Sequence, residues 1–256
     1  MGEKYKGRLL PLPKDDARLP AIVDRIERIN SYLSRQTFAP IGPVRLVRKF
    51  NQGDAEGFAW NKGGRLYGPH SWMKKDTERA LITINGEATV ELDFRTSHLT
   101  ILAGLGHVPG LVLGEADPYT VEGIPRPVVK QWVTMTLSHG RRHSRWSAVA
   151  IAELGKQGVD LRSDFPLKRT GDSILKALPI LSEEGEGSAV GMGWADLQFI
   201  ESEIVLSAME TLAFDHDVPS LPVHDSLIVP VQAKEAAKKV LEESFKKAVG
   251  VVPVID

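Results

Sequence analysis

The sequence predicts an α+β fold in which a small antiparallel sheet is backed by helices. Two apolar runs within residues 81–94 flank Asn85-Gly86, a dipeptide typical of the two-residue turn of a β-hairpin. A further apolar run, VHDSLIVP at residues 223–230, has the length and β-branched content of a buried strand or hairpin. Apolar side chains recur at helical spacing in three segments, residues 21–35, 197–214 and 233–250. An antiparallel sheet with helices on one face satisfies this order of elements.

The remaining segments before the first long helical section are short. Residues 1–20 contain three prolines and mixed charges, which favours an extended arm. PIGPVRLVRKF, residues 40–50, predicts a short strand with basic side chains on one side. The glycines of NKGGRLYGPH, residues 61–70, predict a turn around Arg65 and Tyr67. A helix is expected to begin just after the hairpin.

The middle of the chain is predicted to be helical, with connecting loops. Proline and glycine punctuate residues 106–125, which indicates a loop-rich connection. RPVVKQWVTMTLSHG, residues 126–140, predicts a helix that tolerates Pro127 in its first turn. Residues 147–195 mix helix and loop. We expect this insertion to lie over the sheet as a second lobe.

Composition narrows the class of protein. The 256 residues suffice for one large or two small domains, and 42% hydrophobic and 25% charged content is ordinary for a globular protein. The absence of cysteine excludes disulfides, a thiolate nucleophile and cysteine-bound zinc. Apolar runs are too short for a membrane span and the start is not a signal peptide, so a cytoplasmic location without membrane contact is expected. With a net charge of −1, any nucleic-acid site must be a local basic patch.

Two aspartates lie inside or at the end of the predicted strands. Asp93 comes near the end of the hairpin's second strand, and Asp225 interrupts the apolar run at residues 223–230. A carboxylate on a buried strand is costly to desolvate without compensation. Two such carboxylates converging on one sheet would repel each other unless a divalent cation lay between them. This arrangement is the one that two-metal phosphoryl-transfer chemistry requires.

Five short motifs over residues 60–230 occur in an order that resembles the palm and fingers of family A polymerases. This family includes the family A DNA polymerases and the single-subunit RNA polymerases of phages and mitochondria. Asp93 in ELDFRTSHL is similar to the first metal-binding aspartate of the family. His224-Asp225 in VHDSLIVP is similar to its second metal motif.

Three further motifs complete the resemblance. Arg126 and Lys130 match the fingers-helix pattern of Arg, three residues, Lys, which grips the incoming triphosphate, and this spacing places both on one helix face. Gln198 lies in a segment that resembles the family's helix before the second metal motif, which touches the template–primer. Arg65 in GGRLYG resembles the Gly-Arg-Leu segment near the minor groove of the primer.

The resemblance implies nucleotidyl transfer to a 3′-hydroxyl by two-metal-ion catalysis. Asp93 and Asp225 would hold two Mg²⁺ ions, for which Mn²⁺ is a substitute. Lys130 and Arg126 would contact phosphates of one nucleotide. His224 would support the bend that exposes the second aspartate, or touch the primer end. The implied partners are nucleoside triphosphates and either a primer–template or single-stranded nucleic acid.

The resemblance also places Phe94 and His98 beside the incoming nucleotide. His98 stands where the DNA polymerases of the family carry the glutamate that excludes the 2′-hydroxyl, and Ser226 resembles the RNA-polymerase form. The choice between a DNA and an RNA product therefore stays open. Ser138 stands where the fingers helix of the family carries a tyrosine, which weakens the predicted stacking on the incoming base.

The most basic short run, RRHSRW at residues 141–146, makes Arg141 and Arg142 candidates for nucleic-acid binding, with a solvated turn as the alternative. The other candidates also have structural interpretations. A strand-end aspartate often caps a helix or forms an ion pair, an Arg/Lys pair often marks a solvated helix face, and His98 suits a buried structural role. Three aromatic residues are expected to serve packing: Tyr67, Trp132 and Trp146.

The resemblance divides the chain into three parts. Residues 1–60 form an arm and helix that serve as a thumb remnant or palm support. Residues 61–105 and 196–256 form the palm, and residues 106–195 form a helical fingers-like insertion. The length leaves no room for an exonuclease domain, and the thumb is expected to be reduced or absent. A protein partner or an oligomer would then supply processivity.

Three functions fit these observations. The main prediction is a minimal nucleic-acid polymerase, with replication as its broad setting. The first alternative is a primer-synthesising or template-independent nucleotidyltransferase on the same scaffold. The second alternative is a nucleic-acid-binding module that keeps the palm without turnover. Primer extension with and without template, using deoxy- and ribonucleotides separately, distinguishes them.

Overall fold

The computed structural model describes residues 7–13, 15–106, 117–139, 142–182 and 192–256. Its α-helices are α1 (Leu19–Leu33), α2 (Ser97–Gly104), α3 (Arg126–His139), α4 (Ala148–Gly155), α5 (Leu167–Ala177), α6 (Trp194–Asp215) and α7 (Lys234–Val249). Its strands are β1 (Phe38–Ala39), β2 (Val47–Phe50), β3 (Gly63–Tyr67), β4 (Thr83–Ile84), β5 (Glu87–Asp93), β6 (Leu221–Val223) and β7 (Ser226–Pro230). Short 3₁₀ turns are η1 (Pro69–Trp72), η2 (Arg79–Leu81), η3 (Pro179–Leu181) and η4 (Val231–Ala233).

The main sheet has five strands in the order β1-β4-β5-β7-β6, and each neighbouring pair is antiparallel. The turn between β4 and β5 is Asn85-Gly86, with φ of 54° and 82°, as a hairpin turn with two left-handed residues requires. The centre of the sheet pairs β5 with β7, and Asp93 lies opposite Ser226. The α+β prediction is confirmed.

The run at residues 223–230 forms a hairpin rather than one strand. His224 and Asp225 make the turn between β6 and β7, and His224 has a φ of 56°. This positive φ is unusual for a residue with a side chain, and the turn lifts Asp225 out of the strand ladder. Asp225 therefore sits at the same edge of the sheet at which β5 ends.

The prediction of a turn around Arg65 and Tyr67 is wrong, because both lie in β3, which pairs with β2 in a separate two-stranded sheet. Gly63 and Gly64 have φ of 75° and 76° and open this strand. A Cβ on Gly64 would lie 2.9 Å from Oγ of Ser202 on α6. The glycines thus serve close strand–helix packing instead of a turn.

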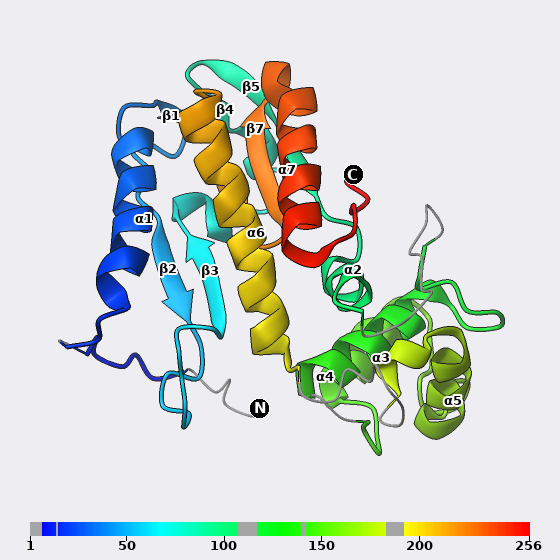
Figure 1. Cartoon of the computed structure of the whole chain (residues 1–256). Coiled ribbons are helices and arrows are strands. Elements are labelled where there is room, and N and C mark those ends of the chain that lie inside the picture. The colour runs from blue at the N-terminus through cyan, green and yellow to red at the C-terminus, as the bar shows by residue number, and fades with distance from the viewer. Residues whose placement is uncertain (1–6, 14, 107–116, 140–141, 183–191) are drawn as a thin grey trace.

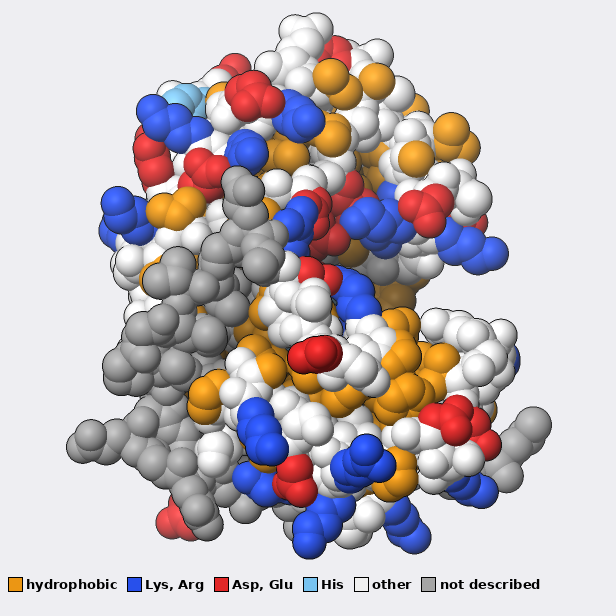
Figure 2. All heavy atoms as spheres, turned by 90° about the vertical axis from the view of Figure 1, so that its right-hand side faces the viewer, with side chains coloured by type: hydrophobic (Ala, Val, Ile, Leu, Met, Phe, Trp, Pro, Cys, Tyr) orange, Lys and Arg blue, Asp and Glu red, His pale blue; other side chains and the backbone are white. Residues whose placement is uncertain are grey.

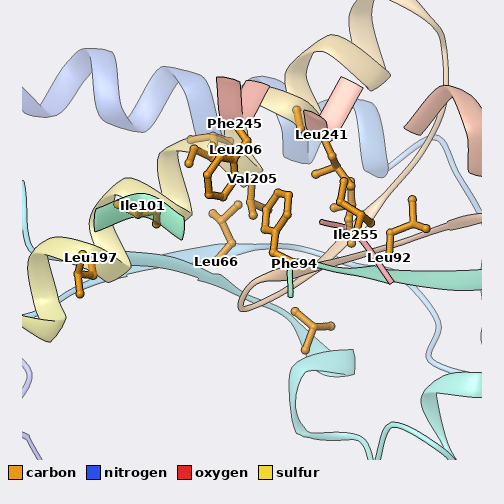
Figure 3. Packing of buried hydrophobic residues seen from close by; sticks show 14 of the residues in the cluster. Leu66, Leu92, Phe94, Ile101, Leu197, Val205, Leu206, Leu241, Phe245 and Ile255 are labelled. Atoms are coloured by element: carbon orange, nitrogen blue, oxygen red, sulfur yellow. The ribbon is translucent and has the colours of Figure 1, made fainter. Parts of the chain in front are cut away.

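Two long helices, α6 and α7, lie together against the sheet (Figure 1). Phe94 follows β5, and its ring meets the ring of Phe245 of α7 at a centroid distance of 5.0 Å. Figure 3 shows Phe94, Phe245 and Leu206 of α6 pointing into the same cluster. This core holds the ends of β5 and β7 in place, because cores of this kind are close-packed.

The helices α3, α4 and α5 lie beside the sheet, beyond α2 (Figure 1). Trp132 and Trp146 are buried there, as expected for packing residues. Gly171 of α5 lies so close to Trp132 that a Cβ would come within 2.8 Å of the indole Nε1, so α5 packs tightly on α3. No helix in the described part of the chain is both long and apolar enough for a membrane span.

Candidate active site

A cleft of about 640 Å³ opens where the sheet edge, α2, α3 and α6 approach one another. Figure 2 shows the molecule hollowed between the part that carries the sheet and the part that carries α3–α5, with acidic and basic side chains at the hollow. Eight of the predicted site residues line this cleft: Arg65, Asp93, Phe94, His98, Arg126, Lys130, Gln198 and Asp225.

The two aspartates approach each other through the β5–β7 ladder. Asp93 is the last residue of β5, and the backbone N–H of Phe94 donates to the carbonyl of Asp225 at 3.1 Å. Residues more than a hundred positions apart in the chain thus become neighbours at one sheet edge. Backbone hydrogen bonds set their placement, so little conformational freedom is left to lose when a ligand binds.

The electrostatic surroundings of the two aspartates differ. Burial raises the pKa of Asp225 to about 6, and the nearby charges of Glu201 and Asp93 act in the same direction. Asp93 instead accepts a hydrogen bond from Nζ of Lys75 at 2.9 Å. This contact raises the pKa of Lys75. Asp225 therefore carries the charge that the fold compensates least.

On the opposite wall, α3 presents Arg126 and Lys130, one helical turn apart. Arg126 forms an ion pair with Asp117, and its guanidinium lies 5.4 Å from the ring centroid of Tyr119. Burial alone would raise the pKa of Asp117, but hydrogen bonds from Arg126 and from the backbone N–H of Tyr119 lower it. The cleft thus joins an acidic sheet edge to a basic helix face.

Glu201 of α6 is the most deeply buried ionised group in the cleft, with 1% of its side chain exposed. It accepts hydrogen bonds from Nε of Arg65 at 2.9 Å and from Oγ of Ser97 at 2.9 Å. Nε2 of His98 lies 3.3 Å from its carboxylate. Burial would raise the pKa of Glu201, but His98 and Arg65 together lower it to about 2. Glu201 thereby ties two predicted site residues to α6.

Of the other predicted residues, two line the cleft and one does not. Gln198 lines the cleft and accepts a hydrogen bond at 3.4 Å from Nδ2 of Asn51. Phe94 lines the cleft, although its ring packs in the core and only 4% of the residue is exposed. His224 does not line the cleft; its ring lies 5.9 Å from that of Tyr67, and burial lowers its pKa.

The basic run contributes less than the other motifs. Arg142 lies 4.0 Å from Asp172 of α5 and is absent from the cleft lining. Arg141 lies outside the described residues. Among the described residues, the contact with Asp172 places Arg142 against α5, and neither of these two residues lines the cleft with the two aspartates.

The donor set of the cleft fits a divalent cation. Among the described residues, no group of three or more histidine or carboxylate side chains has the geometry of a metal site. Hard cations such as Mg²⁺ take few protein ligands, however, and complete their shell with water and substrate phosphates. The raised pKa of Asp225, next to two other carboxylates, is the feature that a bound cation would relieve.

Two cleft residues escaped the sequence analysis, Glu201 and Tyr119, and so did Lys75, which contacts Asp93 but does not line the cleft. Glu201 lies three residues after Gln198 on an apolar helix face, and a glutamate at such a position was a usable signal. Tyr119 sits in a loop-rich segment without periodicity. Lys75 lies in a charged stretch and reaches Asp93 only through the tertiary fold.

No model of a protein family and no curated protein matches this chain. Among solved structures, the chain is similar to the POL domain of Pol1 from M. smegmatis, described in complex with a DNA primer-template and dNTP. The TM-score is 0.47 and the sequence identity is 17%. The match covers 93% of this chain and 50% of that chain, so this chain spans about half the length of that protein. A similarity at this level does not establish the family of the chain.

Proposed function

We propose that this protein is a minimal nucleotidyltransferase that adds nucleotides to the 3′-hydroxyl of a nucleic-acid strand. One observation carries the proposal: a single cleft brings Asp93 and Asp225 opposite Arg126 and Lys130. Phosphoryl-transfer sites need an anionic pole for cations and a cationic pole for phosphates. The ordered motifs of the sequence support the same conclusion.

In this proposal Asp93 and Asp225 hold the divalent cations, Mg²⁺ or Mn²⁺. When bound, such cations lower the pKa of an attacking hydroxyl and neutralise charge on a leaving pyrophosphate. The sheet edge contributes fixed ligand positions, because Asp93 ends β5 and the backbone carbonyl of Asp225 accepts a hydrogen bond from the N–H of Phe94. The ammonium of Lys75 contacts the carboxylate of Asp93. When a divalent cation binds there, this ammonium either moves aside or remains as a further positive charge.

Arg126 and Lys130 bind the triphosphate of the incoming nucleotide. In the proposed reaction the 3′-oxygen forms a bond to the α-phosphorus, and the bond from this phosphorus to the bridging oxygen breaks. Pyrophosphate leaves with both electrons of that bond, and the hydroxyl proton passes to solvent. Lys130 donates hydrogen bonds to the departing phosphates, which stabilises their charge.

Tyr119 and His98 are proposed to contact the base and the sugar. The predicted tyrosine is missing from α3, where Ser138 lines the cleft instead. Tyr119 places a half-buried ring in the same cleft beside Arg126. His98 is held by Glu201 at a cleft position that suits contact with the ribose. The product, DNA or RNA, follows from how this histidine treats the 2′-hydroxyl.

The three parts of the chain receive corresponding roles. Residues 61–105 and 196–256 act as the palm, and residues 106–195 act as fingers that carry the phosphate-binding helix. Within residues 1–60, α1 is proposed as a palm support, because Arg25 of α1 forms ion pairs with Glu203 and Glu210 of α6. A partner or a second copy of the chain would supply processivity.

Nucleotide incorporation tests the proposal directly. A labelled primer–template is incubated with each NTP and each dNTP in Mg²⁺ or Mn²⁺, and extension is followed on a denaturing gel. Asp225→Ala is expected to abolish extension, whereas Asp215→Ala at the exposed end of α6 leaves it unchanged. Equal extension by wild type and Asp225→Ala would refute the assignment.

The pairing of Asp93 with Lys75 favours a second candidate, a nucleic-acid-binding module without turnover. An ion pair already satisfies part of the charge that a metal would otherwise neutralise. Oligonucleotide binding without any extension would support this candidate. Extension in the absence of template would instead identify a primer-synthesising or template-independent transferase.

A further inference from the structure

A partly exposed aromatic surface lies next to the cleft, and we define it by exposed Lys49 and Trp72 and half-buried Tyr67 and His224. The rings of Tyr67 and Trp72 are stacked, with centroids 5.8 Å apart and an interplanar angle of 15°. The ring of Tyr67 meets that of His224 edge-on at 5.9 Å. These residues come from β2, β3, η1 and the β6–β7 turn, so the tertiary fold alone assembles them.

Packing does not account for Trp72. Tryptophan has one of the largest side chains in the protein, yet 74% of Trp72 is exposed. By contrast, three other tryptophans are at least 90% buried: Trp60, Trp132 and Trp146. An indole left in water forfeits most of the stabilisation that its burial would provide. Its position is better explained by contact with a ligand.

Lys49 adds a positive charge to the same surface. Its Nζ lies 4.8 Å from the ring centroid of Tyr67 and 5.7 Å from that of Trp72. Among the described residues, no carboxylate lies within ion-pair distance of Lys49, and the residue is exposed. A cation held over two rings is preorganised for a phosphate, since aromatic contacts restrict the lysine without neutralising it.

The aromatic surface reaches the acidic sheet edge by two routes. His224 touches Tyr67 and directly precedes Asp225 in the chain. Three residues after Trp72, Lys75 contacts Asp93 through Nζ. In addition, Nδ1 of His224 is buried without a hydrogen-bond partner, which leaves a polar atom to satisfy at the junction.

We propose that this surface binds an unpaired segment of a nucleic-acid strand, with a base stacked on Trp72 and a phosphate at Lys49. Aromatic platforms interleaved with cations bind single strands without sequence preference, because every base has a π-face. The free face of an exposed indole is available to an unpaired base and not to one inside a duplex. That the strand continues into the cleft rests on the proposed function; the binding itself does not.

Binding is measured by fluorescence anisotropy with a labelled twelve-nucleotide oligothymidylate, without nucleotide triphosphate or metal. Trp72→Ala is expected to weaken binding roughly 10-fold or more, and Trp72→Phe to restore most of it. Lys49→Gln is expected to reduce the slope of log affinity against log salt by about 0.7, the contribution of one phosphate on a single strand. A blunt duplex of equal length should bind more weakly than the single strand.

Phe214→Ala is the matched control. Phe214 is also an exposed aromatic residue under a cation, with the guanidinium of Arg28 4.8 Å from its ring, but it lies near the far end of α6. Equal weakening by Trp72→Ala and Phe214→Ala, or none by either, would overturn the proposal, as would failure of the wild type to bind. Circular dichroism and urea unfolding of each variant identify any loss of fold.

The two proposals fail separately. Binding that depends on Trp72 without any nucleotide incorporation would refute the polymerase proposal and support this binding site. Incorporation together with oligonucleotide binding that does not depend on Trp72 would support the polymerase proposal and refute this binding site. The proposal would also be overturned if a peptide or protein bound to the aromatic surface and the oligonucleotide did not compete with it.

Discussion

The two walls of the cleft are built on opposite physical principles. On the sheet wall, Asp93 and Asp225 are set by backbone pairing, and Asp225 is buried at a cost that raises its pKa to about 6. On the α3 wall, Arg126 has 52% of its side chain exposed and reaches the cleft on a flexible stem. The acidic wall is therefore preorganised and strained, whereas the basic wall is adaptable and screened by solvent.

This difference separates stability from binding. A buried charge that the fold does not compensate lowers the free energy of unfolding, so substitutions on the sheet wall should alter stability and its pH dependence. An exposed cation contributes little to stability, so substitutions on α3 should alter ligand binding alone. The four predictions below test this separation.

Asp225→Asn should stabilise the fold by about 3 kcal/mol at pH 8. The folded-state pKa of Asp225 is raised from 3.8 to about 6, so the carboxyl costs nothing when protonated at low pH and its penalty grows as pH rises through 6. The gain should therefore vanish near pH 4. Urea unfolding at both pH values measures it, and Asp215→Asn is the control. An unchanged or lower midpoint at pH 8 would contradict the buried, uncompensated state of Asp225.

Glu201→Gln should destabilise the fold by about 1–2 kcal/mol, because Arg65 and His98 lose a buried anionic partner. The pKa of Glu201 is lowered from 4.5 to about 2, so its contribution is present above pH 4.5 and lost as pH falls toward 2. The cost of the substitution should thus be present at pH 6 and shrink as pH falls from 4.5 toward 2. Urea unfolding checks it, with exposed Glu243→Gln of α7 as the matched control.

Lys130→Ala should raise the KM for nucleotide roughly 10-fold with a change in stability below about 0.5 kcal/mol. In the proposed function the ammonium of Lys130 binds the phosphates, and among the described residues it has no ion-pair partner. Primer-extension kinetics at two ionic strengths measures the effect, which should shrink at high salt. Lys156→Ala, exposed at the end of α4, is the control. A drop in melting temperature of several degrees would instead show that Lys130 stabilises the fold.

Lys75→Gln should produce the smallest change, a few-fold tighter binding of Mg²⁺ or Mn²⁺ at the cleft. Removing the ammonium from Asp93 removes a competing cation from the proposed metal site. Mn²⁺ binding by electron paramagnetic resonance, without nucleotide, reports the affinity. Lys74→Gln, exposed and next in the chain, is the matched control. Weaker binding after Lys75→Gln would show that the lysine assists the metal rather than competing with it.

Much of the fold follows from local patterns, and the errors have a common cause. Asn85-Gly86 predicts its hairpin turn because two adjacent residues there must adopt positive φ, a requirement that the dipeptide satisfies by itself. Gly63 and Gly64 carry the same signal but serve close packing of β3 on α6. A glycine shows that a special conformation or approach is needed, and the neighbouring element decides which one.

The candidate site divides in the same way. The positions of Asp93, Asp225, Arg126 and Lys130 in their elements were predictable, because strand ends and helix faces follow from short-range periodicity. The partners of these residues were not. The attachment of Lys75 to Asp93 and the burial of Glu201 depend on contacts between segments that are far apart in the chain.

By itself, the sequence determined the long helices, the hairpin turn at Asn85-Gly86, the position of Asp93 at a strand end and the spacing of two cations on one helix face. Only the tertiary structure decided that these groups share one cleft, that Glu201 braces Arg65 and His98, and that Trp72 stays in water beside them. The physical reason is range. Backbone preferences act over a few residues, whereas desolvation and charge pairing depend on whatever the folded chain brings close.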